Sequence, residues 1–247
     1  MICQKAYSVN ISDVDFTKSL KLSALFNYFQ DIACVGAESL GIGIDTLIEK
    51  YNVTWVITRF RINIFRNPVL NEKITIETWH HGHKRLEFER DFRVLDSDGN
   101  VIASAASAWI ILDIKTREIR RPELITYDPS TIRDERAIDG KFGRLRAVGE
   151  LEAVYKKRIG YSDIDLNGHI NNSKYVDYAM DCFCTDRFSE HSVKSFAIDY
   201  ISEALPEDML VLYKDISSNT SLSYIEGINE KSGKVVFRSQ IEFETKS

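Results

Sequence analysis

Three side chains that can take part in catalysis lie close together in the segment Asp165-Leu166-Asn167-Gly168-His169. This segment places a carboxylate, a carboxamide and an imidazole at alternate positions, directly before Ile170-Asn171-Asn172. A second segment, Asp199-Tyr200-Ile201-Ser202-Glu203, adds another carboxylate about one helix and one strand later. Glutamate and histidine are common general bases, and an amide can orient a water or donate to an oxyanion. Each residue alone is more often structural, but the joint pattern predicts an active site.

Two segments with helical periodicity are expected to position these groups. Apolar residues recur at i, i+3, i+4 and i+7 from Leu22 to Val35, which predicts a helix that buries one face. A second helix is predicted from Asn172 to Phe183, with Asn171 or Asn172 as its cap. Alternating, β-branched segments predict strands at residues 54–64, 74–79, 86–95, 101–114, 193–200, 209–216, 221–230 and 234–244. One helix followed by several strands, twice over, indicates an α+β fold.

The first half repeats the frame of the candidate site without its reactive groups. Ser12-Asp13-Val14-Asp15 matches Ser162-Asp163-Ile164-Asp165, but Thr17 and Ser19 replace the amide and the imidazole. The shared aspartates, Asp13, Asp15 and Asp163, are therefore expected to cap and pin the loop. We expect an N-terminal domain, residues 1–120, without catalytic residues, and a C-terminal domain, residues 151–247, that carries them. Residues 121–150 lack strong periodicity and are expected to form a linker with at most a short helix.

The composition indicates a compact globular chain. It has 247 residues, of which 44% are hydrophobic and 28% charged, and its net charge of −5 argues against nucleic acid as a partner. The amino terminus lacks a signal-peptide pattern, and the most apolar window, residues 103–112, is too short to span a bilayer. The four cysteines are irregularly spaced and are expected to be free thiols. We therefore expect a cytoplasmic protein that does not bind a membrane.

The motifs resemble one enzyme family. Asp-x-Asp-x-Asn-x-His-Ile-Asn-Asn-x-x-Tyr at residues 163–175, with Asp-Tyr-x-x-Glu at 199–203, is similar to the acyl-acyl-carrier-protein thioesterases of plants and bacteria. Glu-Thr-Trp at 77–79 and Asp31-Ile32-Ala33 extend the resemblance over nearly the whole chain. It implies a double hotdog, in which each of two tandem repeats wraps a long helix in an antiparallel sheet. It also implies hydrolysis of fatty acyl-acyl-carrier protein to free fatty acid, which terminates fatty acid synthesis.

By motif, the resemblance assigns catalysis to Asp165, Asn167, His169 and Glu203. We expect Glu203 and His169 to activate a water that Asn167 orients, and backbone amides at 170–172 to stabilise the oxyanion. Asp165 either orients His169 or attacks the thioester to form an anhydride, and water attack is the favoured route. Plant members commonly have a cysteine directly after the glutamate, where this chain has Ala204, so a cysteine nucleophile is not expected there. No cofactor or metal is expected.

Substrate binding is expected to involve large apolar residues of the first half and a basic surface. Candidate lining residues of the acyl tunnel are Leu25, Phe29, Trp55, Ile57, Phe60 and Trp79, although any one of them could simply be core. Because acyl-carrier protein is acidic, its docking surface is expected to be basic. Candidates are Lys84-Arg85, residues 115–121 and Lys156-Lys157-Arg158. The oligomeric state, monomer or homodimer, stays open.

Four alternatives fit the sequence less well. His80-His81-Gly82-His83 could bind zinc or copper if exposed, but no matching cysteine or acidic ligands accompany it, so a polar loop is favoured. An acyl-CoA thioesterase could use the same catalytic residues. A non-catalytic acyl-binding sensor would keep the tunnel without needing Glu203 and His169. Hotdog dehydratases carry Asp-x-Asn-Pro-x-His, and this chain has no such proline.

Overall fold

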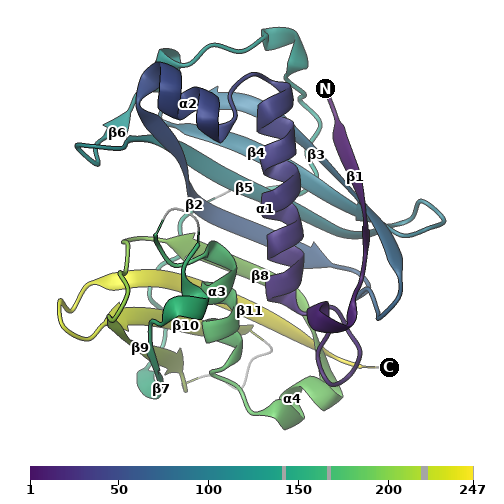
Figure 1. Ribbon diagram of the computed structural model, residues 1–247. Helices are drawn as coiled ribbons and strands as arrows, with labels where there is room; N and C mark the ends of the chain where they lie inside the picture. Colours follow the sequence, from purple (N-terminus) through teal and green to yellow (C-terminus); the bar gives the residue numbers. More distant parts are fainter. Residues whose placement is uncertain (141–142, 166–167, 218–221, 247) are drawn as a thin grey trace. The chain divides into compact units, whose positions relative to one another are not determined.

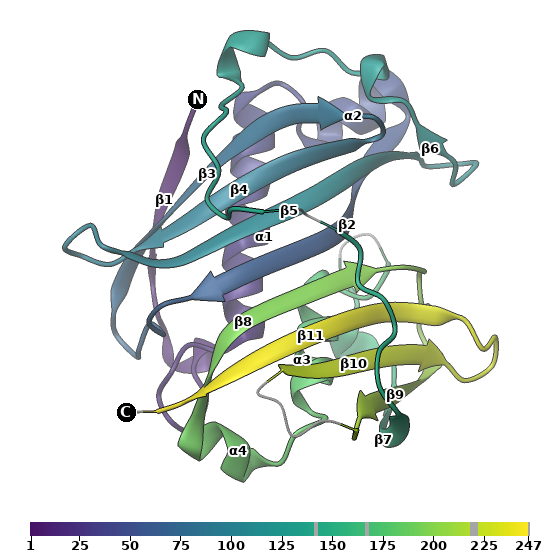
Figure 2. The same cartoon turned by 180° about the vertical axis from the view of Figure 1, so that it is seen from behind.

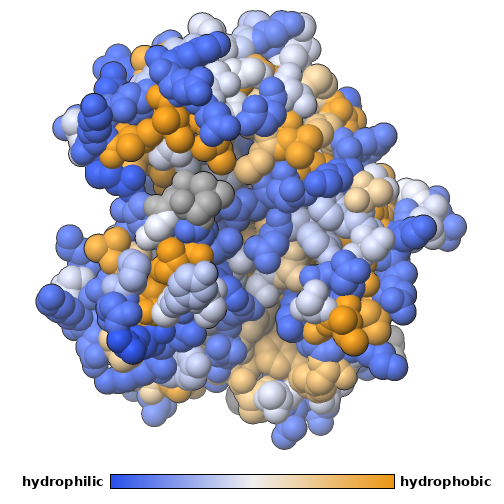
Figure 3. Space-filling model, in the orientation of Figure 1, coloured by the Kyte–Doolittle hydropathy of each residue, from blue (hydrophilic) through white to orange (hydrophobic). Residues whose placement is uncertain are grey.

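A computed structural model describes residues 1–140, 143–165, 168–217 and 222–246 of the chain (Figure 1). Over these residues the fold is α+β as predicted, mostly antiparallel sheet with few helices. It divides into two compact units, Met1–Leu20 with Asn27–Lys141 (unit 1) and Lys21–Phe26 with Phe142–Ser247 (unit 2). Among the described residues, no helix combines the length and apolarity needed to cross a membrane. The face drawn in Figure 3 is largely hydrophilic and carries separate apolar areas.

Unit 1 contains an antiparallel sheet in the order β1-β3-β4-β5-β2, with the short β6 paired to β5. Its strands are β1 (Cys3–Ser8), β2 (Val53–Ile64), β3 (Lys73–Lys84), β4 (Glu87–Leu95), β5 (Val101–Asp113) and β6 (Ile119–Arg120). Its helices are α2 (Ile44–Tyr51) and the 3₁₀ turns η1 (Ile11–Asp13), η2 (Pro122–Leu124) and η3 (Pro129–Thr131). Helix α1 (Leu22–Ser39) is longer than predicted, and its first residues group with unit 2.

Unit 2 contains an antiparallel sheet in the order β8-β11-β10-β9-β7. Its strands are β7 (Leu151–Arg158), β8 (His191–Tyr200), β9 (Met209–Asp215), β10 (Leu222–Asn229) and β11 (Val235–Thr245). Its helices are η4 (Tyr161–Asp163), α3 (Asn172–Met180) and α4 (Thr185–Glu190). The strands of the two units therefore have the same order: β2 pairs with β5 as β8 pairs with β11, and β1 and β7 each lie at the far edge.

Helix α1 lies against the sheet of unit 1 (Figure 1), and aromatic side chains form this contact. The ring of Phe29 lies 5.3 Å from that of Phe60 on β2 and 5.0 Å from that of Phe92 on β4, centroid to centroid. All three side chains are buried. Burial of a side chain of this size contributes roughly 1.5–3 kcal/mol, so this cluster is a main reason that the amphipathic face of α1 binds the sheet.

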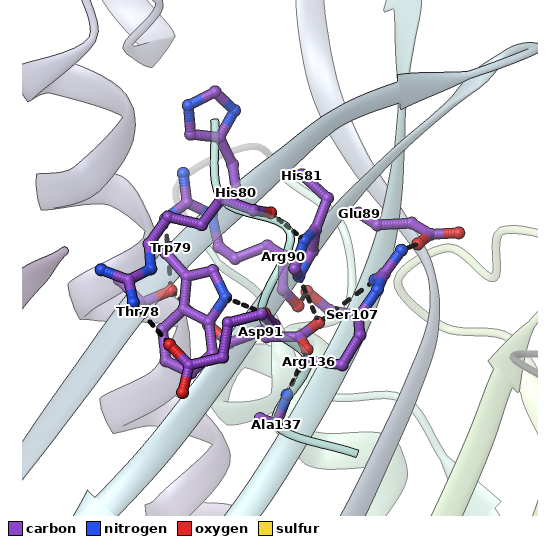
Figure 4. A network of polar contacts seen from close by, with 12 residues as sticks. Thr78, Trp79, His80, His81, Glu89, Arg90, Asp91, Ser107, Arg136 and Ala137 are labelled. Atoms are coloured by element: carbon purple, nitrogen blue, oxygen red, sulfur yellow. Dashed lines mark hydrogen bonds and ion pairs between the residues drawn. The ribbon is translucent and has the colours of Figure 1, made fainter. Parts of the chain in front are cut away.

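Residues 127–137, which we call the outer segment, run along one end of this sheet and then over its opposite face (Figure 2). The Trp79 indole Nε1 donates to Glu135 O at 2.7 Å, and the Ala137 N–H donates to Asp91 Oδ2 at 2.7 Å (Figure 4). Trp79 and Asp91 are buried because this segment lies over them. The predicted linker begins at residue 121. Up to Ala137, its residues are therefore part of the packed structure of unit 1.

Candidate active site

The loop before α3 is closed by its own backbone and by one buried carboxylate. Asp163 Oδ2 accepts a hydrogen bond from Gly160 N at 2.8 Å. Within this frame, Asp165 N donates to His169 O at 2.8 Å, and Gly168 N donates to Asp165 O at 3.0 Å. Gly168 has a φ of +76°, a conformation that glycine adopts without strain. The turn therefore holds the backbones of Asp165 and His169 side by side.

A second loop, after β8, carries the candidate glutamate. Ile201 N donates to Val236 O at 2.8 Å, which continues the pairing of β8 with β11 for one residue. Leu205 N donates to Asp208 Oδ2 at 2.9 Å, which closes the other end of the loop. Glu203 lies between these two fixed points, so its backbone position is set by both.

The two loops bring His169 and Glu203 together. His169 Nε2 lies 3.7 Å from Glu203 Oε2, a distance that allows an ion pair but exceeds a direct hydrogen bond. The two side chains are 34% and 47% exposed, so both can reach a substrate or a water. Asn167 lies outside the described residues. Asp165 is placed by its backbone next to His169, as described above.

Tyr175, which the sequence analysis did not single out, connects the same two loops from within the core. It is buried on α3, and its ring lies 5.6 Å from that of Tyr200 and 5.4 Å from that of Phe237. Burial raises its pKa far above the usual range; the charge of Asp165 acts in the same direction, and a hydrogen bond with the Ala204 backbone opposes it. The hydroxyl therefore stays protonated between the Asp165 turn and the residue after Glu203. The sequence signal was its place in Asn-Asn-x-x-Tyr.

The start of helix α3 is capped as predicted, but its amides are partly occupied. Asn171 is the cap, and its side-chain oxygen accepts from Ser173 N at 2.9 Å. The Asn171 N–H itself donates to Asp163 O at 2.9 Å. The expectation that all amides at 170–172 serve an oxyanion site is therefore wrong for Asn171. Ile170 and Asn172 remain candidates.

The corresponding loops of unit 1 have the same hydrogen bonds without the reactive side chains. Asp15 N donates to Ser19 O at 2.9 Å, and Lys18 N donates to Asp15 O at 3.0 Å. Lys18 has a φ of +63°, as Gly168 does in its own turn with +76°. The Asp13 carboxylate accepts from Asn10 N at 2.9 Å, which confirms the predicted structural role of the shared aspartates.

The loop after β2 also matches the loop after β8. Phe65 N donates to Ile102 O at 2.9 Å, and Val69 N donates to Glu72 Oε2 at 3.0 Å. By this register, Asn67 of unit 1 occupies the position of Glu203 in unit 2. The backbone scaffold is thus present twice, and among the described residues only unit 2 provides an imidazole and a carboxylate on it.

The predicted substrate-lining residues do not all lie on one face. Leu25, Phe29, Ile57 and Phe60 are buried, and the partly buried Trp55 donates from Nε1 to Ile42 O at 2.9 Å. Phe92 contacts Phe29 of α1, and Thr78 pairs with Phe92, so Thr78 faces α1. Because side chains alternate along a strand, Trp79 points to the opposite face, under the outer segment. The structure does not bring Trp79 together with Phe29 and Phe60.

The prediction of a polar loop at residues 80–83 is wrong, because these residues are part of strand β3. Each histidine contacts the chain after β6: His80 Nε2 lies 2.8 Å from Thr131 Oγ1, and His81 Nδ1 donates to Arg133 O at 2.5 Å. His83 Nδ1 lies 3.3 Å from the Tyr127 hydroxyl. In the described part of the chain, no group of three or more His, Cys, Asp or Glu side chains is arranged to hold a metal ion.

Comparisons of the sequence and of the structure with known proteins point to the same family. Residues 1–126 match the acyl-ACP thioesterase N-terminal domain, and residues 150–245 match the acyl-ACP thioesterase C-terminal domain. Among solved structures, an acyl-ACP thioesterase from Bacteroides thetaiotaomicron is 30% identical, with a TM-score of 0.90 and 98% of each chain covered. A 12:0-ACP thioesterase from Umbellularia californica is 21% identical, with a TM-score of 0.85 over 99% of this chain and 98% of its own, a likeness of fold.

Curated plant proteins match at a lower level. The chloroplastic oleoyl-acyl carrier protein thioesterase of Coriandrum sativum is 24% identical over 92% of this chain. The chloroplastic dodecanoyl-[acyl-carrier-protein] hydrolase of Cinnamomum camphora is 24% identical over 100% of this chain. The chain spans about two thirds of the length of these curated relatives, 66% and 68% respectively.

Proposed function

Because this chain belongs to the acyl-ACP thioesterase family, we propose that it hydrolyses the thioester between a fatty acyl chain and acyl-carrier protein. The products are a free fatty acid and holo-carrier protein, and the reaction terminates fatty acid synthesis. The observation that carries this proposal is the 3.7 Å approach of His169 Nε2 to Glu203 Oε2, on two loops whose counterparts in unit 1 lack both groups. This is the difference expected if one copy of a repeated scaffold does the chemistry.

In the proposed mechanism, Glu203 and His169 activate a water. The 3.7 Å gap between them is too long for a direct hydrogen bond and leaves a place where a water can contact both. Asn167 orients this water or donates to the carbonyl oxygen, and the Ile170 and Asn172 amides at the start of α3 add positive potential. Both side chains are partly exposed, so bound substrate would have to exclude solvent from them.

Asp165 has two possible roles, as an orienting group for His169 or as the attacking nucleophile. Its backbone N–H donates to His169 O at 2.8 Å, which keeps the two residues within one turn and is compatible with either role. Single turnover in ¹⁸O-water separates the two routes. Label that enters the Asp165 side chain would contradict direct attack by water.

We further infer that each unit is a hotdog repeat. The support is the shared strand order, in which β2 pairs with β5 in unit 1 and β8 pairs with β11 in unit 2. We propose that the acyl chain binds in unit 1 on the face that α1 covers, against residues such as Phe29, Ile57 and Phe60. All four cysteines are free, which supports a reducing compartment such as the cytoplasm.

The docking surface for the acidic carrier protein is better supported on unit 1 than on β7. Lys156 Nζ lies 2.6 Å from Glu230 Oε1, Lys157 Nζ lies 3.4 Å from Asp163 Oδ2, and Arg158 is paired with Glu207. Their charges are therefore already neutralised locally. Lys84 and Arg85, at the turn between β3 and β4, have no ion pair with any described residue. We propose this turn as a contact for the carrier protein.

The test is thiol release from carrier-protein substrates of C8 to C18 beside the matching acyl-CoAs. Glu203→Ala should lower kcat/KM by about 10²–10⁴-fold. Asn67→Ala, at the equivalent position of unit 1, is the matched control and should change it less than about twofold. Faster turnover of the CoA esters would favour an acyl-CoA thioesterase. No release from either, with acyl chains still bound, would mean an acyl-binding sensor.

A further inference from the structure

Arg90 is a buried cation that the proposed reaction does not use. It lies on β4, two residues before Phe92, so both side chains point to the face of the sheet that α1 covers. It pairs across the sheet with His80 on β3 and with Ser107 on β5 (Figure 4). The three form a polar row directly next to the apolar cluster of Phe29, Phe60 and Phe92.

No described residue neutralises the positive charge of Arg90. Arg90 Nη1 donates to Thr78 Oγ1 at 3.2 Å, and among the described residues no carboxylate forms an ion pair with it. Burial lowers the pKa of Arg90 to about 10, so the guanidinium is still charged at neutral pH. His80 adds no second positive charge beside it, because burial lowers the pKa of His80 to about 4 and keeps the imidazole neutral.

The same unit shows how a buried arginine is normally paired. Arg59 is also buried, and its Nη1 and Nη2 donate to the two carboxylate oxygens of Glu87 at 2.8 and 2.6 Å. Two parallel bonds of this kind compensate much of the cost of removing the charge from water. Arg90 lacks any such partner among the described residues, so the cost of removing its charge from water is not compensated in this way.

The guanidinium packs closely against helix α1. A Cβ atom on Gly36 of α1 would lie 2.7 Å from Arg90 Nη1, so the guanidinium fits here because this position of the helix has no side chain. Arg90 Nε and Nη2 have no acceptor among the described residues. Neither atom is among the polar atoms that are fully enclosed and have no hydrogen bond. These two N–H-bearing nitrogens therefore keep some accessible surface and have N–H groups that the described residues do not use.

We propose that Arg90 binds an oxygen-bearing group, a hydroxyl or a carboxylate, at or near the distal end of an acyl chain held in unit 1. The Phe29–Phe60–Phe92 cluster contacts the hydrocarbon, and the Nε and Nη2 N–H groups of Arg90 donate hydrogen bonds to the oxygen. A carboxylate is the stronger ligand because it neutralises the charge and can bind bidentately. The inference rests on the proposed acyl binding in unit 1 and extends it from plain fatty acyl chains to oxygenated ones.

The first experiment compares carrier-protein thioesters of plain, ω-hydroxy and ω-carboxy acyl chains at each even length from C8 to C18. At the length that reaches Arg90, the native enzyme should favour an oxygenated chain, and Arg90→Met should reduce that preference by about tenfold or more. Arg93→Met is the matched control, because Arg93 lies on the same strand and faces the outer segment, with its guanidinium 4.9 Å from the Trp79 ring. An equal ratio of oxygenated to plain turnover in native and Arg90→Met enzyme, at every length, would overturn the proposal.

A second measurement does not depend on hydrolysis. Calorimetric titration with free dicarboxylic acids and the matching monocarboxylic acids should show tighter binding of the dicarboxylic acid to the native chain, and this advantage should disappear in Arg90→Met. If no thioester is hydrolysed but this difference is found, the proposed function fails and the Arg90 site stands. If thioesters are hydrolysed but neither assay discriminates, the site is wrong and the function stands.

The fold of the variant is a further check. Since Arg90→Met replaces an unpaired buried charge by an apolar side chain of similar length, its thermal midpoint should be unchanged or higher. Arg90→Lys keeps the charge but loses the planar fork, and it should retain part of the preference for the carboxylate and little for the hydroxyl. A lysine variant identical to the native enzyme with both ligands would contradict recognition by the guanidinium fork.

Discussion

Ser19 in unit 1 and His169 in unit 2 occupy equivalent positions in two turns with the same backbone hydrogen bonds. The carbonyl oxygen of each accepts the N–H of the aspartate four residues earlier, at 2.9 Å from Asp15 and at 2.8 Å from Asp165. The turn is therefore a property of the repeated backbone, and the imidazole is an addition to it in the second copy.

This equivalence predicts that the first copy can be changed without loss of activity. Ser19→Ala and Asn67→Ala should each leave kcat and KM within about twofold of the native values, because neither residue provides an acid, a base or an ion. Steady-state kinetics with one carrier-protein substrate measures this. A tenfold loss of kcat in either variant would mean that the unit 1 turn takes part in the reaction.

His169 and Glu203 should behave as one catalytic unit. His169→Gln and Glu203→Gln are each expected to lower kcat by about 10²–10⁴-fold, and the double variant should be little worse than the worse single one. The measurement is single-turnover hydrolysis of one acyl-carrier-protein substrate. Because both side chains are partly exposed, unfolding midpoints should barely move. If the loss of kcat in the double variant equals the product of the two single losses, the two groups act independently.

Tyr175 is expected to hold the Asp165 turn and the loop of Glu203 in position from within the core. In Tyr175→Phe, the hydroxyl between the Asp165 turn and the Ala204 backbone is lost, and kcat should fall by about tenfold with KM little changed. The stability cost should be about 1 kcal/mol, the usual value for one buried hydrogen bond. Tyr224→Phe is the control, because the Tyr224 hydroxyl donates to Glu226 Oε2 at 2.7 Å on β10 and should affect stability alone. Equal kcat in the two variants would argue against a positioning role.

The free energy of unfolding should depend on pH through His80. Its pKa is lowered from 6.5 to about 4, chiefly by burial and then by the charge of Arg90. A lowered pKa means that the unfolded chain binds the proton more readily. This contribution to stability is therefore complete above about pH 6.5 and is lost as the pH falls toward 4.

Urea unfolding of native protein and His80→Gln at pH 7 and pH 5 checks this expectation. The native protein should lose more stability between the two pH values than the variant does. The same pH dependence in both proteins would assign the effect to other groups.

Strands and helices were predictable where one face of an element is buried. The long α1 and the strands β2, β4 and β5 have clear apolar periodicity and begin and end within a few residues of the predicted positions. Strands β1 and β7 were missed, because each lies at the far edge of its unit's sheet with mostly exposed or partly exposed side chains. Such strands are held by backbone pairing, which leaves no pattern in the side chains.

The site was only partly predictable, for a different reason. The two loops and the approach of His169 to Glu203 follow from motifs that are local in sequence. The burial of His80 and His81 depends on a segment about fifty residues away, so the local sequence reads as a polar loop. Tyr175 stands in the Asn-Asn-x-x-Tyr motif, but its place on a helix gives no sign of the loop contacts made by its hydroxyl.

The outer segment also determines where unit 1 can be cut. The match to the N-terminal family domain ends at residue 126, but Trp79 and Asp91 receive their hydrogen-bond partners from Glu135 and Ala137. A fragment that ends at residue 126 would lack these partners. The Trp79 indole and the Asp91 carboxylate would then be exposed on the sheet, and the fragment would be prone to aggregate. The smallest piece that can fold cooperatively on this side of the chain therefore extends at least to Ala137.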